Sequence, residues 1–127
     1  MIRQKYIDGY EGEGRVLVYC LDNDQNQNGM MIWEGYFEFL LAACYYKTFP
    51  KGGLLEAYYY HNGFYENSPW QIENIGSAAT ELENFDIRKI DTISPEIAFV
   101  VQELKKDLIS FFKKMICEGK EVYIEYN

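Results

Sequence analysis

The residues best suited to bind an ion lie together in one polar segment, Asp24–Gly29, which reads Asp-Gln-Asn-Gln-Asn-Gly. This pattern fits the first half of a calcium loop, in which alternate side chains turn oxygen atoms toward one cation. The glutamate that completes such a loop would fall at Gly35, and Glu34 lies one position short. We therefore expect a turn whose polar side chains bond their own backbone, with a calcium site as the alternative. No bound metal or other cofactor is expected.

Nucleophilic catalysis would require a cysteine or a serine within hydrogen-bond reach of a base. His61 is the only histidine, and the three cysteines, Cys20, Cys44 and Cys117, lie in separate apolar segments. No serine lies in a G-x-S-x-G motif, which would mark the nucleophile of many hydrolases. The sequence therefore predicts a protein without catalytic activity of its own.

Two pairs of carboxylates, Asp22 with Asp24 and Glu81 with Glu83, could act as a general acid and a general base. That chemistry needs one carboxyl group to be buried, so that its pKa rises toward neutral pH. Both pairs lie in polar surroundings in the sequence. We expect all four carboxylates to be solvated.

The charge of the chain excludes several classes of partner. It has 20 acidic and 12 basic side chains, a formal net charge of −8, and 12 tyrosine, 8 phenylalanine and 2 tryptophan residues. Surfaces that bind nucleic acid combine aromatic side chains with lysine or arginine, whereas here the aromatic residues have acidic neighbours. These neighbours include Tyr10/Glu11, Trp33/Glu34, Tyr36-Phe37/Glu38, Tyr65/Glu66 and Tyr123/Glu125. We therefore expect no binding to nucleic acid or to an anionic membrane.

The length of 127 residues suits one domain, which we place at residues 1–127,. The longest apolar run, Phe39–Tyr46, has eight residues, far fewer than the ~20 that cross a bilayer. Three widely spaced cysteines do not form a disulfide framework, and no apolar signal segment follows the first residues,. We therefore expect a cytoplasmic protein with reduced thiols.

The first half of the chain predicts a strand followed by a helix. Residues 15–22 are apolar on both faces, which is typical of a strand in the middle of a covered sheet,. Residues 23–29 form a polar loop. Apolar residues then recur at helical spacing over residues 30–47, which predicts a helix, with a strand at 30–39 and a shorter helix as the alternative,.

Residues 54–66 predict a β-hairpin, because Asn62-Gly63 suits the two central positions of a type I′ turn,. Two further strands are expected near 70–72 and 85–90, separated by a turn.

The clearest element is a helix over residues 94–118. Ser94 is a favoured N-cap, Pro95 a favoured first residue, and Gly119 a favoured residue after the last turn,. Residues 121–127 alternate between apolar and polar, which indicates a strand,. The whole order predicts an α+β fold, in which two helices, the longer near the C-terminus, pack on a mixed, mainly antiparallel sheet.

In size, acidity and aromatic content, the whole chain resembles the small immunity proteins that bacteria encode beside polymorphic toxins, including contact-dependent growth inhibition toxins. The resemblance implies a cytoplasmic domain that binds one cognate toxin domain, commonly a basic nuclease, and blocks its active site. For the contact surface we select acids after the first strand, together with acids and one tryptophan in the segment 66–86. These residues are Asp22, Asp24, Glu66, Trp70, Glu73, Glu81, Glu83 and Asp86.

Two other functions remain open from the sequence. One is a small enzyme or ligand-binding domain with an aromatic pocket. The other is an acidic, phage-type inhibitor of a protein that binds nucleic acid.

Overall fold

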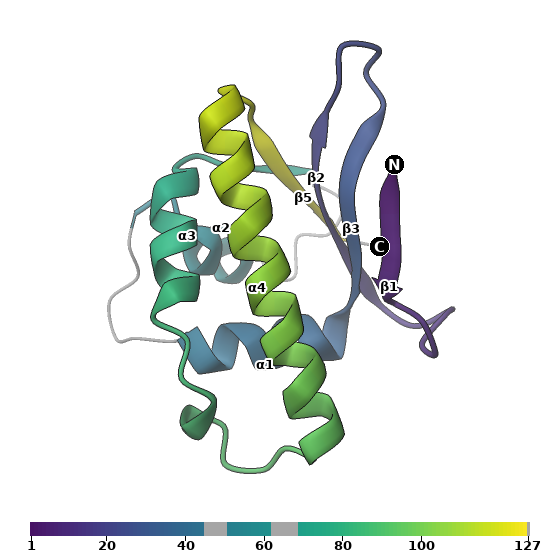
Figure 1. Ribbon diagram of the computed structural model, residues 1–127, viewed down its shortest axis with the longest axis vertical. Coiled ribbons are helices and arrows are strands. Elements are labelled where there is room, and N and C mark those ends of the chain that lie inside the picture. The colour runs from purple at the N-terminus through teal and green to yellow at the C-terminus, as the bar shows by residue number, and fades with distance from the viewer. Residues whose placement is uncertain (45–50, 62–68, 127) are drawn as a thin grey trace.

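Five strands form a sheet, and the helices gather on one side of it (Figure 1). The computed structural model describes residues 1–44, 51–61 and 69–126, without the side chains of residues 60 and 61. The strands are β1 (Ile2–Tyr6), β2 (Arg15–Leu21), β3 (Gln27–Trp33), β4 (Trp70–Ile72) and β5 (Val122–Tyr126). Their spatial order is β1-β3-β2-β5-β4. β1 runs parallel to β3, and the other three neighbouring pairs are antiparallel.

Four α-helices and a short 3-10 helix lie in the described part of the chain. They are α1 (Glu34–Cys44), α2 (Leu54–His61), α3 (Ile75–Glu83), α4 (Pro95–Glu118) and the 3-10 helix η2 (Ile87–Lys89). The prediction of an α+β fold with a mixed, mainly antiparallel sheet is confirmed, and the longest helix does lie near the C-terminus. The number of helices is larger than the two expected. None of the helices within these ranges combines the length and apolarity that crossing a membrane requires.

The central strand β2 is buried on both faces, as its continuous apolar sequence predicts. Val16 and Val18 are fully buried on the face that packs against the helices. Leu17 and Tyr19 are also buried on the opposite face, where the Tyr19 ring lies 5.7 Å from the ring of Tyr123 on β5.

The helix expected over residues 30–47 begins later; the alternative, a strand followed by a helix, is correct in order, but its strand at 30–39 ends already at Trp33. β3 pairs with β2 along its whole length, and α1 starts at Glu34. Pairing with β2 satisfies the backbone groups of residues 27–33, and this outweighs the helical spacing of their apolar side chains. Residues 45–47 lie outside the described residues.

Three other predictions for the middle of the chain are wrong. Residues 54–61 form α2, where a hairpin strand was expected, and the Asn62-Gly63 turn lies outside the described residues. Residues 75–83 form α3 in place of a turn, and its first turn is capped by Asn74, whose side chain accepts the Ser77 N–H at 3.0 Å. Residues 87–89 form η2 in place of a strand at 85–90.

The C-terminal elements are as predicted. The Ser94 hydroxyl accepts the Ile97 N–H at 3.2 Å, and Gly119 ends α4 with a φ of 65°. One hydrophobic core joins the elements, and α4 contributes a stripe of buried side chains to it. That stripe consists of Val101, Leu104, Leu108, Phe112 and Met115.

Candidate partner-binding surface

The structure does not gather the eight selected residues on one surface. Asp22 and Asp24 lie in the β2–β3 turn, which extends away from the helices, α3 among them (Figure 1). Trp70 and Glu81 lie in the interior, with 5% and 2% of their surface exposed. Glu66 lies outside the described residues. The other five selected residues are exposed or half-buried and divide between the β2–β3 turn and the region of α3.

The β2–β3 turn is built as the sequence predicts, by side chains that bond the local backbone. The Asp22 carboxylate accepts the N–H groups of Asp24 and Asn26, each at 2.9 Å, and the side-chain amide of Asn28 at 3.2 Å. These hydrogen bonds lower the pKa of Asp22. The Asp22 carboxylate therefore stabilises the turn. Among the described residues, no group of three or more His, Cys, Asp or Glu side chains is placed to hold a metal ion.

Glu81 is a structural residue, so the expectation that it is solvated is wrong. Its carboxylate accepts the N–H of Leu54 at 2.7 Å and the N–H of Leu55 at 3.3 Å, at the start of α2. A side chain at Gly53 would overlap this carboxylate. Burial raises the pKa of Glu81 from 4.5 to about 7, although the two hydrogen bonds act in the opposite direction. Glu81 thus joins α3 to α2 from the inside of the molecule.

The thiol of Cys44 lies in the same interior region. Burial, and then the charge of Glu81, raise the pKa of Cys44 to about 12. Because the thiolate is the reactive form, this cysteine stays protonated and unreactive near neutral pH.

Three of the selected acids remain on the surface near α3. Glu83 forms an ion pair with Lys113 of α4 at 3.2 Å. Asp86 caps η2 and forms an ion pair with Arg88 at 3.0 Å. Glu73 is exposed after β4. Because Glu83 and Asp86 already have basic partners, they offer less unpaired charge to another protein.

A different region combines aromatic rings with acids, and we call its three rings the aromatic corner: Tyr10 and Trp33, which are half-buried, and Tyr36, which is buried beneath them. The Tyr10 and Trp33 rings stack, with centroids 3.8 Å apart and planes within 7°. The Tyr36 ring meets both edge-on, at 5.4 Å from Tyr10 and 4.9 Å from Trp33. Aromatic pairs of this kind contribute about 0.5–1.5 kcal/mol each beyond their buried area. These contacts therefore favour the observed arrangement of the three rings.

Two features of the local sequence position these rings. Tyr10 lies in the β1–β2 loop between Gly9 and Gly12, which have φ angles of 88° and 91° that other residues rarely adopt,. Trp33 ends β3 and lies over Gly35, where any side chain would overlap its indole ring. Gly35 interrupts the helical pattern of the sequence, but its lack of a side chain leaves the space into which the Trp33 ring packs.

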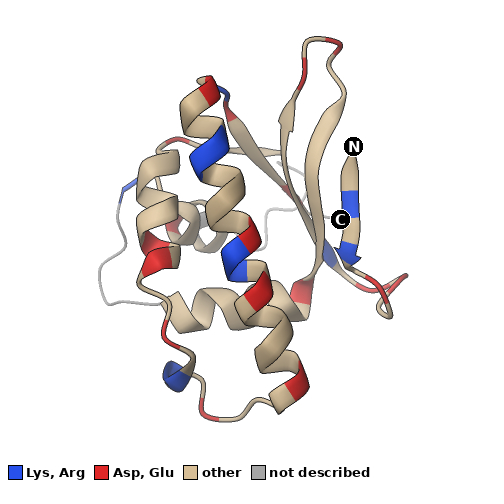
Figure 2. Cartoon of the chain, in the orientation of Figure 1, with Lys and Arg blue, Asp and Glu red and all other residues tan. Residues whose placement is uncertain are grey.

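Four acids lie in the same two segments as Tyr10 and Tyr36, and we call them the acidic rim: Glu11 and Glu13 in the β1–β2 loop, and Glu34 and Glu38 in α1. The Glu34 N–H donates to the Gly14 carbonyl at 3.0 Å, which ties the loop to the start of α1. Glu38 lies one turn further along α1, and burial, followed by the charge of Glu34, raises its pKa. Figure 2 shows the acidic residues of the β1–β2 loop and of the start of α1.

The sequence contains a pattern that points to this region, although none of its residues is among the eight selected for the contact surface. Tyr10, Trp33 and Tyr36 each have an acid within two residues. Their convergence depends on β1 lying beside β3, a parallel pairing between segments more than 20 residues apart. Such a pairing leaves no local pattern in the sequence.

Comparison with known proteins does not assign the chain to a family. No protein-family model, no curated protein and no solved structure matches it significantly.

Proposed function

We propose that this chain is an immunity-type protein that binds a basic toxin domain in the cytoplasm and blocks its active site. The observation that carries the proposal is the aromatic corner with its acidic rim. Tyrosine and tryptophan are the side chains that protein interfaces use most as anchors, because each buries a large area with few rotatable bonds. An acidic rim around such anchors steers a basic partner and opposes nucleic acid.

The exposure of the corner supports this role. Tyr10 and Trp33 are half-buried, so each keeps one part of its ring packed and another part available. Glu11, Glu13 and Glu38 are exposed around them. A preorganised surface of this kind loses little side-chain entropy when a partner binds.

The test begins with capture of partners from the native host, followed by identification of the bound protein. We expect a basic protein domain, encoded beside this chain, that binds in a 1:1 complex weakened by salt. Expression of that domain alone should arrest bacterial growth, and co-expression of this chain should restore it. The proposal fails if the identified partner is not toxic, or if growth stays arrested when a stable complex forms.

A further inference from the structure

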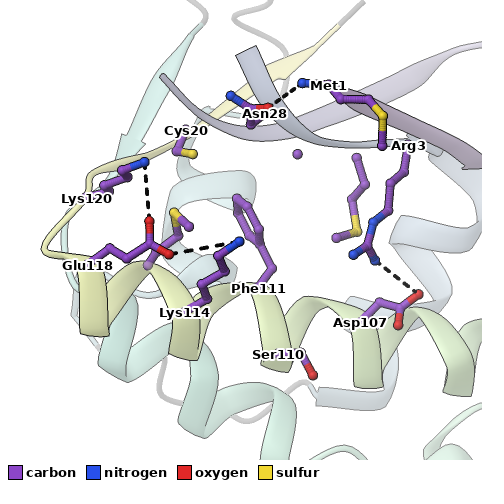
Figure 3. Close-up of a pocket in the computed structure, with 13 residues that line it drawn as sticks. Met1, Arg3, Cys20, Asn28, Asp107, Ser110, Phe111, Lys114, Glu118 and Lys120 are labelled. Carbon is purple, nitrogen blue, oxygen red and sulfur yellow. Dashed lines mark hydrogen bonds and ion pairs between the residues drawn. The ribbon is translucent and has the colours of Figure 1, made fainter. Parts of the chain in front are cut away.

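A pocket of about 330 Å³ lies between α4 and the edge of the sheet formed by β1, β3 and β2. The side chains of Arg3 and Asn28 enter it from the sheet, and those of Phe111 and Lys114 enter it from α4 (Figure 3). This volume lies at the lower end of the range for small-molecule sites, which is roughly 300–1,000 Å³. The pocket is distinct from the aromatic corner, since none of its lining residues belongs to the corner or its rim.

The inner wall of the pocket is apolar and rich in sulfur. Cys20, Met30 and Met115 line it and are almost fully buried, and the Phe111 ring of α4 also lines it (Figure 3). Methionine side chains are flexible and polarisable, so such a wall adapts to apolar groups of different shape.

The mouth of the pocket has the opposite charge to the rest of the chain. Three basic side chains, Arg3, Lys114 and Lys120, face only two acids, Asp107 and Glu118. This excess of positive charge occurs in a chain whose net charge is −8.

The acids at the mouth are shared and loosely paired. Glu118 lies 3.3 Å from Lys120 and 4.0 Å from Lys114, so one carboxylate serves two ammonium groups. Asp107 lies 3.9 Å from Arg3 and also accepts the Tyr6 hydroxyl. Exposed ion pairs of this length contribute little to stability. An incoming anion can therefore replace these carboxylates as the partner of the basic side chains with little loss of stability.

We infer that this pocket binds a small organic anion, a carboxylate attached to an apolar body. The carboxylate would lie between Lys114 and Arg3 at the mouth, and the apolar body would lie against Phe111 and the methionines. The inference is independent of the proposed toxin-binding function.

The test uses octanoate as the probe, below the concentration at which it forms micelles, and follows backbone amide signals by NMR. We expect saturable shifts centred on Gly29, Ser110 and Phe111. Hexanoate should bind several-fold more weakly, since each buried methylene contributes up to about fourfold in affinity. Octylammonium, which has the same chain and the opposite charge, should not shift these signals.

Two matched variants test whether the Lys114 ammonium group binds the carboxylate of octanoate. Lys114→Met, which keeps the alkyl stem, should weaken octanoate binding by up to about fivefold. Lys113→Met is the control, because Lys113 is the adjacent residue of α4 and pairs with Glu83 outside the pocket. The inference is overturned if octanoate does not saturate, if octylammonium binds as well, or if both variants weaken binding equally.

Discussion

Glu81 shows how a single residue can contradict its local sequence. The polar residues beside it, Thr80 and Glu83, are exposed, yet its own carboxylate is buried and accepts the N–H groups of Leu54 and Leu55. These partners are 27 and 26 residues away, so no local pattern could predict them. By contrast, the hydrogen bonds that the Asp22 side chain accepts come from residues at most six positions away. The sequence did predict this turn, in which polar side chains bond the local backbone.

Burial of Glu81 makes the stability of the fold depend on pH. Because its pKa in the folded protein is about 7 and its ordinary value is 4.5, the folded state holds its proton more tightly than the unfolded state. The contribution of Glu81 to stability is therefore fully present below pH 4.5 and is lost as the pH rises to about 7, a change of about 3 kcal/mol. Glu81→Gln should remove this decline, measured by urea unfolding at pH 5 and pH 8. Glu83→Gln, an exposed position on the same helix, should keep it.

The same decline in Glu81→Gln as in the unmodified chain would contradict this account of Glu81. Asp22 and Asp86, whose pKa values are lowered, act in the opposite direction at more acidic pH. They are present in all three proteins and cancel in the comparison.

Gly35 tests the packing of the aromatic corner. Replacing a glycine by alanine inside an exposed helix normally stabilises a protein by up to about 1 kcal/mol. At Gly35 the added methyl group would overlap the Trp33 ring, so Gly35→Ala should destabilise the protein by about 1–3 kcal/mol and shift its tryptophan fluorescence. At Gly76 of α3 the new methyl group would meet only the Asn74 side chain, at 3.3 Å. Gly76→Ala should therefore change stability by less than about 1 kcal/mol, and a stabilised Gly35→Ala variant would show that the ring is not held there.

At the scale of elements, α4 was predictable because its signals are local. Ser94, Pro95 and Gly119 mark its ends, and a helical stripe of apolar residues fills its length. α2 was not predictable, because its aromatic residues suit a strand and its N-terminus is satisfied by Glu81 of α3. α3 could have been recognised from Asn74, which is a favoured N-cap residue,.

The Ser94 cap should be measurable in the stability of the whole fold. Ser94→Ala removes the acceptor for the Ile97 N–H and should lower the free energy of unfolding by about 1 kcal/mol. Ser94→Asp restores an acceptor and adds a favourable charge at the helix N-terminus, so it should recover the loss. Equal stability of Ser94→Ala and the unmodified chain in chemical denaturation would exclude a role for the cap.

At the scale of the whole molecule, charge is divided between two regions. The acidic rim and the aromatic corner share the β1–β2 loop and the start of α1, whereas basic side chains exceed acids at the mouth of the α4 pocket. Net charge and aromatic content were readable in the sequence. Their division between two surfaces depends on the parallel pairing of β1 with β3 and on the packing of α4.

The most direct test of the central claim is the affinity of two charge-matched double variants for the identified partner. Glu13→Lys with Glu38→Lys reverses two charges of the acidic rim. Asp24→Lys with Glu73→Lys reverses two exposed charges elsewhere, and both variants have the same net charge. We expect the rim variant to raise the Kd about tenfold or more and the other variant to change it by no more than about threefold, as measured by calorimetry at physiological salt. Equal Kd values for the two variants, or a weaker complex only for Asp24→Lys with Glu73→Lys, would contradict the assignment of the aromatic corner as the binding surface.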